Sequence, residues 1–520
     1  MLVFSIGDCH FRFGNHDENA QRHGCMLAGN VGGQGSCLVQ CKNDNDGLPL
    51  HDSDCYGIVA FVFNNNRYLR GGIGVESSGK TPAGMLKIAT ASALGATIEW
   101  YDFFLYGVMT ALVFNKLFFP NFDPWVGTML AYSTFMVGFV SRPLGGLIFG
   151  HYGDRLGRKN ILVLTLLIMG VATFIIGLLP TYEAVGVWAP ALLLFVRLLQ
   201  GIGIGGEWGG AVLMTVEHAP DGKRAFYGSW PQMGAPAGLC LSSGAVLLFS
   251  QLPEAQFLSW GWRVPFLLSG LLVAIGLYIR LSIIETPEFV AMKKLRRDVA
   301  VPMFELFRRA SREVIIGLGI RYIEAACFNI FGVFIFAYVT TKLGLPRNMV
   351  LDGVIIACLI MILMLPLYGA LADRIGPPRV YAAGSLAIGV TVFFSFWLLD
   401  NSGGNQFLVW LAIIIPFALA YPAVYGPQAA IVSSLFAPEI RYTGISFVYQ
   451  LSSIFFGGFT VIIAAALLEW SSGVPWLVCA YLGFAALVSF ISVGYATSYT
   501  RSAEVDEVDL LSSLGTAGPG

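Results

Sequence analysis

The segment Gly150-His-Tyr-Gly-Asp-Arg-Leu-Gly-Arg-Lys159 follows a long apolar run and is itself rich in charge. A second segment, Gly369-Ala-Leu-Ala-Asp-Arg-Ile-Gly376, repeats its Gly, Asp, Arg and Gly at an offset of 219 residues and also follows an apolar run. Another pair of landmarks in apolar runs, Glu99 and Arg321, stands at an offset of 222 residues. The chain therefore contains two related halves, an organisation that many secondary transporters use to build two bundles around a central site.

The composition is that of a membrane protein. Of the 520 residues, 56% are hydrophobic and only 12% are charged, whereas soluble domains contain about 25% charged residues. A chain this apolar is not expected to be disordered. Its net charge of -1 leaves no surplus of positive charge for binding nucleic acid.

About twelve apolar spans, in two sets of six, are long enough to cross a bilayer. We therefore predict an all-α membrane protein with twelve transmembrane helices in two six-helix bundles. The expected divisions are an N-terminal extension at 1–84 that is disordered or reflects a start codon chosen too early, a first bundle at 85–284, a basic cytoplasmic linker at 285–312, a second bundle at 313–497 and a disordered cytoplasmic tail at 498–520.

Basic residues indicate the orientation of the chain, because Lys and Arg of short loops face the cytoplasm. They concentrate in alternate loops, whereas the opposite loops contain only scattered charges. The pattern predicts a multi-pass protein of the cell membrane with both termini in the cytoplasm. The basic residues of these loops are Arg155, Arg158, Lys159, Lys223, Arg224, Arg374 and Arg379.

Ionisable side chains inside the spans are candidates for function, since each costs about 2.5 to 3.5 kcal/mol on insertion scales. Glu99, Asp102 and Tyr106 stand at i, i+3 and i+7, so two carboxyls and a phenol share one helical face. The alternative is that such charges only form pairs that fix the positions of helices. A conduit for an anion and a proton, however, needs both cations and protonatable acids, and the spans contain both: Glu207, Glu324, Arg142, Arg197 and Arg321.

Two nucleotide-binding patterns are interpreted as chance matches. Gly201, Gly203 and Gly206 fit G-x-G-x-x-G but lie inside an apolar span, where small residues let helices approach closely. The segment 74–81 fits G-x-x-x-x-G-K-T without the sheet that a phosphate loop needs. The cysteines and histidines of the first 55 residues lack the paired spacing of a zinc site. No hydrolase motif occurs either, so we expect neither an enzyme nor a metal or cofactor.

The segment 150–159 resembles the signature loop between the second and third helices of the major facilitator superfamily. Within it, the chain resembles the metabolite:proton symporters over about residues 85 to 497. The segments that carry this resemblance are Glu99-Trp-Tyr-Asp-Phe103, Arg142-Pro-Leu-Gly-Gly146, Gly205-Gly-Glu-Trp-Gly-Gly210 and Trp260-Gly-Trp-Arg-Val-Pro-Phe266. The resemblance implies the twelve-helix facilitator fold and a monomer.

The chain departs from the family pattern at the second loop and at the end of the tenth helix. Pro377 and Pro378 stand where the first loop has Arg158 and Lys159. Ser434 stands where relatives often have a glutamate. The cytoplasmic contacts of the second half are therefore expected to differ from those of the first.

This family includes importers of shikimate, 2-oxoglutarate and citrate, and of proline and glycine betaine. We accordingly expect uptake of a small organic acid with a proton as the coupling ion, carried by Asp102 and Glu99 together with Glu207 and Glu324. In this scheme deprotonated Asp102 pairs with Arg142 or Arg197, and its protonation frees the arginine for the substrate carboxylate. The predicted substrate-binding residues are Arg142, Arg197, Arg321, Tyr106, Gln232, Tyr425, Gln428, Tyr449 and Gln450.

The two loop motifs are predicted to gate the cytoplasmic side, through Gly150, Asp154, Arg155, Gly157, Arg158, Asp373 and Arg374. Three alternatives remain: symport of a zwitterion such as proline or glycine betaine, export by the same fold, and a membrane enzyme or sensor that binds without transport. The expected partners are a small carboxylate and the lipid bilayer.

Overall fold

The computed structural model describes residues 3–6, 9–12, 25–28, 38–41, 82–122, 124–281, 285–286, 289–290 and 302–516. Contacts divide the chain into two units, Met1–Glu76 and Ser77–Gly520. The first contains two antiparallel pairs of strands, β1 (Val3–Ile6) with β2 (Cys9–Arg12) and β3 (Cys25–Ala28) with β4 (Leu38–Cys41). These strands lie within the predicted extension. The pattern at 74–81 and most of the predicted linker lie outside the described residues.

Twelve long helical segments make up the described part of the second unit, six in each half of the chain, which confirms the predicted fold class. The first-half segments are α2–η1–α3 (Pro82–Met109, Thr110–Phe114, Asn115–Leu117), α4 (Pro124–Leu156), α5 (Arg158–Leu178), α7 (Trp188–His218), α8–η2–α9 (Arg224–Gly228, Pro231–Met233, Gly234–Phe249) and α10–η3–α11 (Glu254–Gln256, Phe257–Gly261, Arg263–Leu281). A short helix, α6 (Tyr182–Val185), precedes α7.

The second-half segments are α14–η4–α15–η5 (Ser311–Asn329, Ile330–Phe334, Ile335–Ala337, Tyr338–Lys342), α16 (Arg347–Ile375), α17 (Pro377–Asp400), α18–η6–α19 (Gln406–Ile414, Ile415–Ala420, Tyr421–Ser434), α20–η7–α21 (Arg441–Ser452, Ser453–Gly458, Phe459–Trp470) and α22 (Trp476–Thr516). Helix α13 (Pro302–Arg309) lies in the predicted linker, and α22 continues past residue 497 into the predicted tail. By length and composition, ten of the described helices can cross a membrane, and α2 and α4 are the other two long segments.

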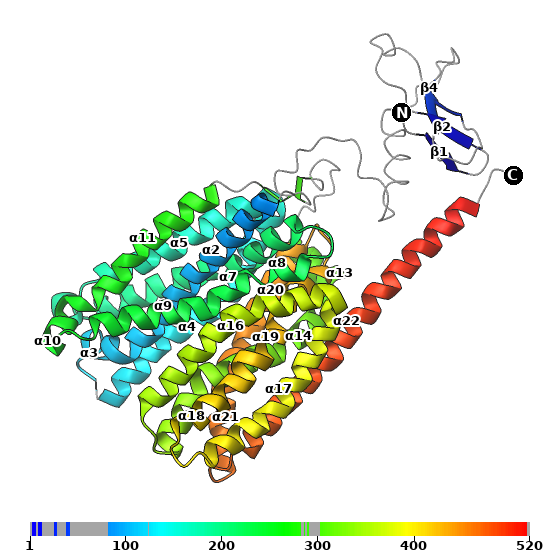
Figure 1. Cartoon of the computed structure of the whole chain (residues 1–520). Helices are drawn as coiled ribbons and strands as arrows, with labels where there is room; N and C mark the ends of the chain where they lie inside the picture. The colour runs from blue at the N-terminus through cyan, green and yellow to red at the C-terminus, as the bar shows by residue number, and fades with distance from the viewer. Residues whose placement is uncertain are drawn as a thin grey trace. The chain divides into compact units, whose positions relative to one another are not determined.

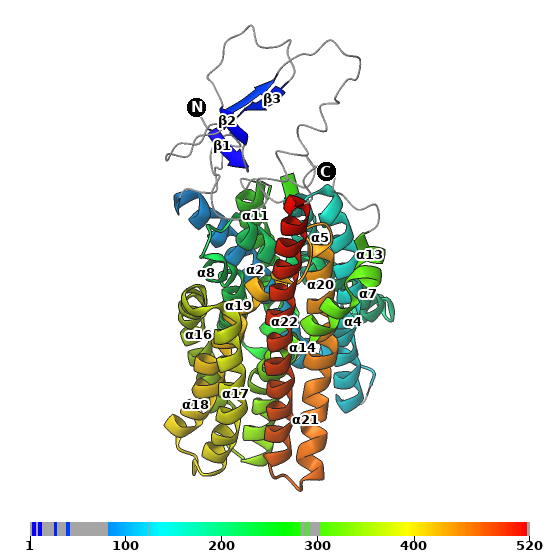
Figure 2. The same ribbon diagram turned by 90° about the vertical axis from the view of Figure 1, so that its right-hand side faces the viewer.

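The helices of the two halves form two bundles that lie side by side, blue to green and yellow to red in Figures 1 and 2. Within the first bundle α7 packs on α4 and α5, and within the second α17 packs on α19 and α22. Between the bundles, α4 contacts α20 while α16 contacts α8 and α9. The interface therefore pairs the motif helix of each half with the segment that begins at Arg224 or Arg441 in the other half.

Glycines allow the closest helix contacts. A Cβ atom at Gly145 would lie 2.0 Å from the carbonyl oxygen of Ile202, and one at Gly205 would lie 2.3 Å from that of Arg142. The glycine-rich run that matches the dinucleotide pattern is thus part of α7, where it packs against α4.

Candidate functional site

A cavity of about 320 Å³ lies between the two bundles. Aromatic rings form much of its wall, and three of its lining side chains carry a charge. Its residues come from both halves: Trp100, Phe103, Phe104, Gly107, Val108, Phe139, Arg142, Ala235, Leu239, Ser243, Arg321, Glu324, Ala325, Phe328, Asn329, Gly332, Val333, Phe336, Leu351, Tyr421, Tyr425, Tyr449, Ser453 and Gly457. A cavity with this mixture of apolar walls and few polar groups is typical of a small-molecule site.

Arg142 in α4 is the cation of this cavity that has no polar partner. Its guanidinium lies over the rings of Phe103 and Phe139, 4.5 and 4.6 Å from their centroids. Within the described residues it forms no hydrogen bond or ion pair, and its Nε is buried without a partner. Since a buried guanidinium without acceptors is costly, Arg142 is placed to receive an anionic group from a ligand.

Arg321 in α14 has its acceptors inside the protein. It forms an ion pair with Glu324, donates to Oε1 of Gln428 at 3.0 Å and lies 3.8 Å from the ring centroid of Tyr449. The carboxylate of Glu324 also accepts a hydrogen bond from Tyr421 at 2.8 Å. Arg321 thus orders the polar wall of the second bundle.

Asp102 in α2 is fully buried and does not line the cavity. Its Oδ2 accepts a hydrogen bond from Thr173 at 2.8 Å, while Oδ1 has no partner among the described residues. Gln200 donates to the Thr173 hydroxyl at 2.7 Å and accepts a hydrogen bond from Arg197. A hydrogen-bonded path therefore joins Arg197 to Asp102 through two neutral side chains that the sequence analysis did not select.

Tyr106 and Arg197 also lie away from the cavity, in the same buried network. The guanidinium of Arg197 is 4.0 Å from the ring centroid of Tyr106, whose hydroxyl is 2.7 Å from that of Thr134. Both residues had been predicted to bind substrate, and the structure places them behind the wall that carries Phe103.

Glu207 in α7 is bound to a residue that the sequence analysis missed. Arg280, in the last turn of α11, holds both carboxylate oxygens of Glu207, and Thr165 donates to Oε2 at 2.9 Å. A Cβ atom at Gly95 would collide with the Arg280 guanidinium, so α2 passes directly beside this pair. Glu99 is buried in α2 and, like Glu207, is not a lining residue.

The end of the bundles that carries Asp154 and Asp373, called here the motif end, is joined by two equivalent sets of hydrogen bonds. Asp154 in α4 accepts from the backbone N–H groups of Tyr442 and Thr443, at 3.1 and 2.9 Å, where α20 begins. Asp373 in α16 accepts from those of Ala225 and Phe226, at 2.9 and 2.8 Å, where α8 begins. Each carboxylate thus caps a helix of the opposite bundle.

Other residues of the predicted gate differ in what they contact. Arg158 lies 3.8 Å from Asp154 and 3.4 Å from Glu217, and the absence of a side chain at Gly150 lets α4 approach Thr443. Gly157 has a φ of 111°, which favours glycine at this turn. Arg155 and Arg374 are exposed.

Contacts between the bundles continue from the motif end to the cavity. Trp208 stacks on Tyr449 with 3.9 Å between ring centroids, and Gln232 accepts from Trp208 at 2.8 Å. Gln450 donates to the carbonyl oxygen of Gly205 at 3.1 Å. The predicted substrate residues Gln232, Gln428 and Gln450 therefore hold protein groups together. The cavity extends the other way, toward Val108, Phe336 and Leu351, so the bundles are closed at the motif end.

Comparison with known proteins agrees with this architecture. The family described as "Sugar (and other) transporter" matches residues 88–301. The shikimate transporter of Escherichia coli (strain K12) is 41% identical over 406 residues, which cover 78% of this chain and 92% of that protein. The proline/betaine transporter of the same organism is 35% identical over 419 residues, covering 78% and 82%.

A solved structure of the proton:xylose symporter XylE, of the major facilitator superfamily, aligns with a TM-score of 0.63 at 16% identity, over 80% of this chain and 95% of that one. At this identity the likeness shows the fold alone. Together with the more similar curated relatives, it identifies the chain as a multi-pass membrane transporter and not an enzyme. The chain belongs to the major facilitator superfamily and, within it, to the metabolite transporters that include the shikimate and proline/betaine transporters.

Proposed function

We propose that this protein imports a small metabolite carboxylate together with a proton. The observation that carries the proposal is Arg142, a guanidinium in the cavity wall without a polar partner among the described residues. Arg offers a planar pair of donors that matches a carboxylate. The rings around it, among them Phe103 and Phe328, suit the carbon skeleton of a small ring or chain compound.

In the proposed mechanism Asp102 is the proton carrier, and its protonation reverses a hydrogen bond. When Asp102 is ionised, the Thr173 hydroxyl donates to it, and Gln200 donates to the same hydroxyl. When Asp102 takes up a proton, its O–H donates to Thr173, whose own proton turns to the carbonyl oxygen of Met169, 3.0 Å away. Loss of the negative charge also weakens the attraction on Arg197, so the proton changes how α2, α5 and α7 are held together.

The orientation and assembly of the protein belong to the same proposal. The basic residues of alternate loops support a cytoplasmic motif end, cytoplasmic termini and a location in the cell membrane. The closed motif end would then be the outward-facing state, which receives substrate from outside. We expect the monomer to be the transporting unit, because the cavity is formed by one chain.

A zwitterion such as proline or betaine is the second candidate substrate, favoured by the proline/betaine relative and by the aromatic wall. Trp100, Phe328 and Tyr421 line the cavity, and aromatic faces attract a quaternary ammonium group. A monoanion moving with one proton carries no net charge, whereas a zwitterion with one proton is electrogenic. The membrane potential, worth about 2.3 kcal/mol per charge per 100 mV, then distinguishes the two candidates.

The test is uptake of labelled shikimate, 2-oxoglutarate and glycine betaine into proteoliposomes under an imposed pH gradient. We expect accumulation of an acid that a protonophore abolishes and that a clamped membrane potential leaves unchanged if the acid moves as a monoanion with one proton. Arg142→Gln should raise the KM for that acid about tenfold or more, and Asp102→Asn should remove the dependence on the pH gradient. Arg379→Gln, an exposed arginine outside the cavity, is the matched control. Accumulation indifferent to the gradient would overturn the proposal.

A further inference from the structure

The two halves of the chain differ at the motif end in one charged contact. In the first half Glu217, at the end of α7, lies 3.4 Å from Arg158 and 3.3 Å from Arg441, the first residue of α20 in the other bundle. This contact holds α7, α5 and α20 together by charge, in addition to the cap that Asp154 provides.

The equivalent positions of the second half have lost two of these three charges. Arg158 corresponds to Pro377 at the repeat offset of 219, and Glu217 corresponds to Ser434, the last residue of α19, at an offset of 217. Arg441 corresponds to Arg224, the first residue of α8, again at an offset of 217. The second half therefore keeps the cation that begins the crossing helix but has no acid at the position facing it.

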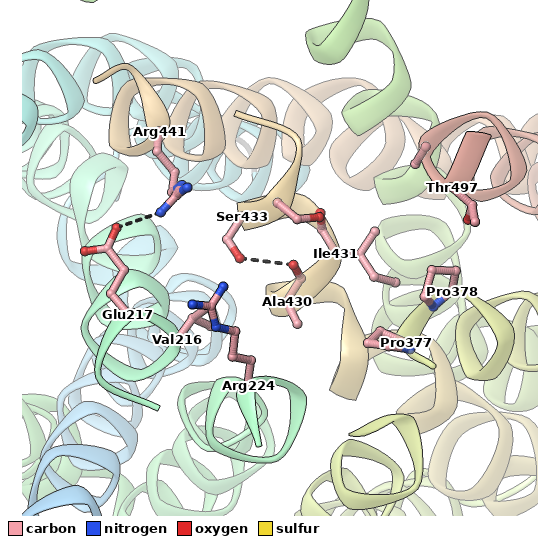
Figure 3. A pocket seen from close by; sticks show the side chains of 12 residues that line it. Val216, Glu217, Arg224, Pro377, Pro378, Ala430, Ile431, Ser433, Arg441 and Thr497 are labelled. Carbon is pink, nitrogen blue, oxygen red and sulfur yellow. Dashed lines mark hydrogen bonds and ion pairs between the residues drawn. The ribbon is translucent and has the colours of Figure 1, made fainter. Parts of the chain in front are cut away.

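A pocket of about 270 Å³ occupies the place of the missing contact, and Figure 3 shows it. Its walls come from both bundles. It is lined by Val216, Glu217, Arg224, Pro377, Pro378, Ala430, Ile431, Ser433, Ser434, Arg441, Ala496 and Thr497. The guanidinium of Arg224 points from α8 into the space between Val216 and Ala430 (Figure 3).

The charges and hydroxyls of the pocket suit an anion. Its one acidic side chain, Glu217, is already balanced by Arg158 and Arg441. The hydroxyl of Ser434, which donates to the carbonyl oxygen of Ile431 at 2.7 Å, can turn toward a ligand because Ser434 is exposed. Arg224 therefore adds positive charge to a space that already contains hydroxyl donors.

We propose that this pocket binds a small oxyanion, a carboxylate or phosphate group from the solution at the motif end. The anion takes the place of the carboxylate that Glu217 provides in the first half. It joins Arg224 of the first bundle to the end of α19 in the second, through charge-assisted hydrogen bonds. Both walls are needed for this contact, so the anion binds the closed motif end more tightly than an open one.

The consequence is regulation of transport by an anion that is not the transported substrate. A ligand shifts an equilibrium between two states by the ratio of its affinities for them, and the separated bundles present only one wall of the pocket. A high concentration of the oxyanion on the motif side therefore keeps that end closed and slows its opening. Because the pocket is separate from the cavity that contains Arg142, this effect is not competition for the transport site.

The first experiment uses the purified full-length transporter in detergent, with inorganic phosphate as the probe and chloride at equal ionic strength as the reference. Spin labels at Leu156→Cys and Ile375→Cys, two exposed positions at the repeat offset of 219 on the motif helices, report the distance between the bundles, after the native cysteines have been replaced by serine. Phosphate should increase the population with the short distance and raise the Tm. Arg224→Gln should weaken the apparent phosphate affinity about tenfold or more, whereas Arg379→Gln should leave it unchanged.

A second variant restores the missing acid. Ser434→Glu places a carboxylate near Arg224, so it should keep the short distance without phosphate and remove the response to phosphate. Equal phosphate responses in the wild type, Arg224→Gln and Ser434→Glu proteins would overturn the proposal. A lipid headgroup offers the same phosphate chemistry, and nanodiscs of phosphatidylcholine with and without phosphatidic acid distinguish the sources. If phosphatidic acid alone shortens the distance, and Arg224→Gln abolishes that effect, the pocket is an oxyanion site that lipid fills.

Discussion

At the scale of single residues, the structure separates charges that have partners from one that lacks them. Arg142 and Arg321 look alike in the sequence, since both are arginines in apolar spans. In the structure Arg321 is held by Glu324 and Gln428, whereas Arg142 faces the cavity over two aromatic rings. The two arginines therefore have different proposed roles, one ordering a wall and one binding substrate.

The pair formed by Arg280 and Glu207 leads to a prediction about stability. Arg280→Met leaves the buried carboxylate of Glu207 without its cation, which should cost about 3 to 5 kcal/mol of unfolding free energy. The double variant Arg280→Met with Glu207→Gln removes the charge as well and should recover most of that loss. Thermal unfolding in detergent measures both. If the double variant is as unstable as the single one, packing of Arg280 beside Gly95, and not the ion pair, is the source of stability.

At the scale of elements, the caps of α20 and α8 determine how firmly the motif end closes. Asp154→Ala removes the acceptor for two backbone N–H groups of α20, and Asp373→Ala does so for α8. Losing such a cap costs about 1 kcal/mol, so each variant should reduce the closed population about fivefold. The distance between labels at Leu156→Cys and Ile375→Cys measures this. An unchanged distance and normal transport in Asp154→Ala would remove Asp154 from the gate.

Helix α5 has a cap that titrates. Glu285, which lies beyond the end of α11, accepts hydrogen bonds from the backbone N–H groups of Arg158 and Lys159. Burial raises the pKa of Glu285 above its ordinary value, although these hydrogen bonds and the charge of Arg158 lower it in part. His218 also contacts this carboxylate.

This raised pKa predicts how stability depends on pH. Because the folded protein holds the Glu285 proton more tightly than the unfolded chain does, its contribution is complete below about pH 4.5 and is lost as the pH rises through the folded pKa. The difference in Tm between the wild type and Glu285→Gln should change over that window, with the wild type losing stability relative to the variant as the pH rises. Parallel Tm curves at all pH values would contradict this assignment.

At the scale of the whole molecule, closure depends on the approach of α7 to α20. A Cβ atom at Gly209 would lie 2.2 Å from the hydroxyl oxygen of Ser446 and 3.1 Å from the ring of Tyr442. Gly209→Val should therefore push the bundles apart at the motif end, lengthen the distance between the labels and lower the Tm. Gly244→Val is the control, because no atom lies within 4 Å of a Cβ atom at that exposed glycine. Equal behaviour of the two variants would show that this contact does not control closure.

The internal repeat is visible in the sequence, but its functional asymmetry is a property of the whole molecule. Both motif aspartates cap helices of the opposite bundle, as their shared pattern suggests. The Pro377 and Ser434 departures were each noted along the chain. Only the structure shows that they border the same pocket, together with Arg224.

The sequence alone determined the fold class, the two halves, the motif loops and which ionisable residues lie inside apolar spans. It did so because a bilayer fixes the length of each span and makes every buried charge expensive, so these features leave a strong local pattern. The substrate-site and proton-site assignments remain predictions. Only the tertiary structure decided that Arg280 binds Glu207, that Thr173 and Gln200 join Asp102 to Arg197, and that Arg142 faces the cavity. The physical reason is that such contacts join helices far apart in the chain, and the partner of a charge depends on how those helices pack.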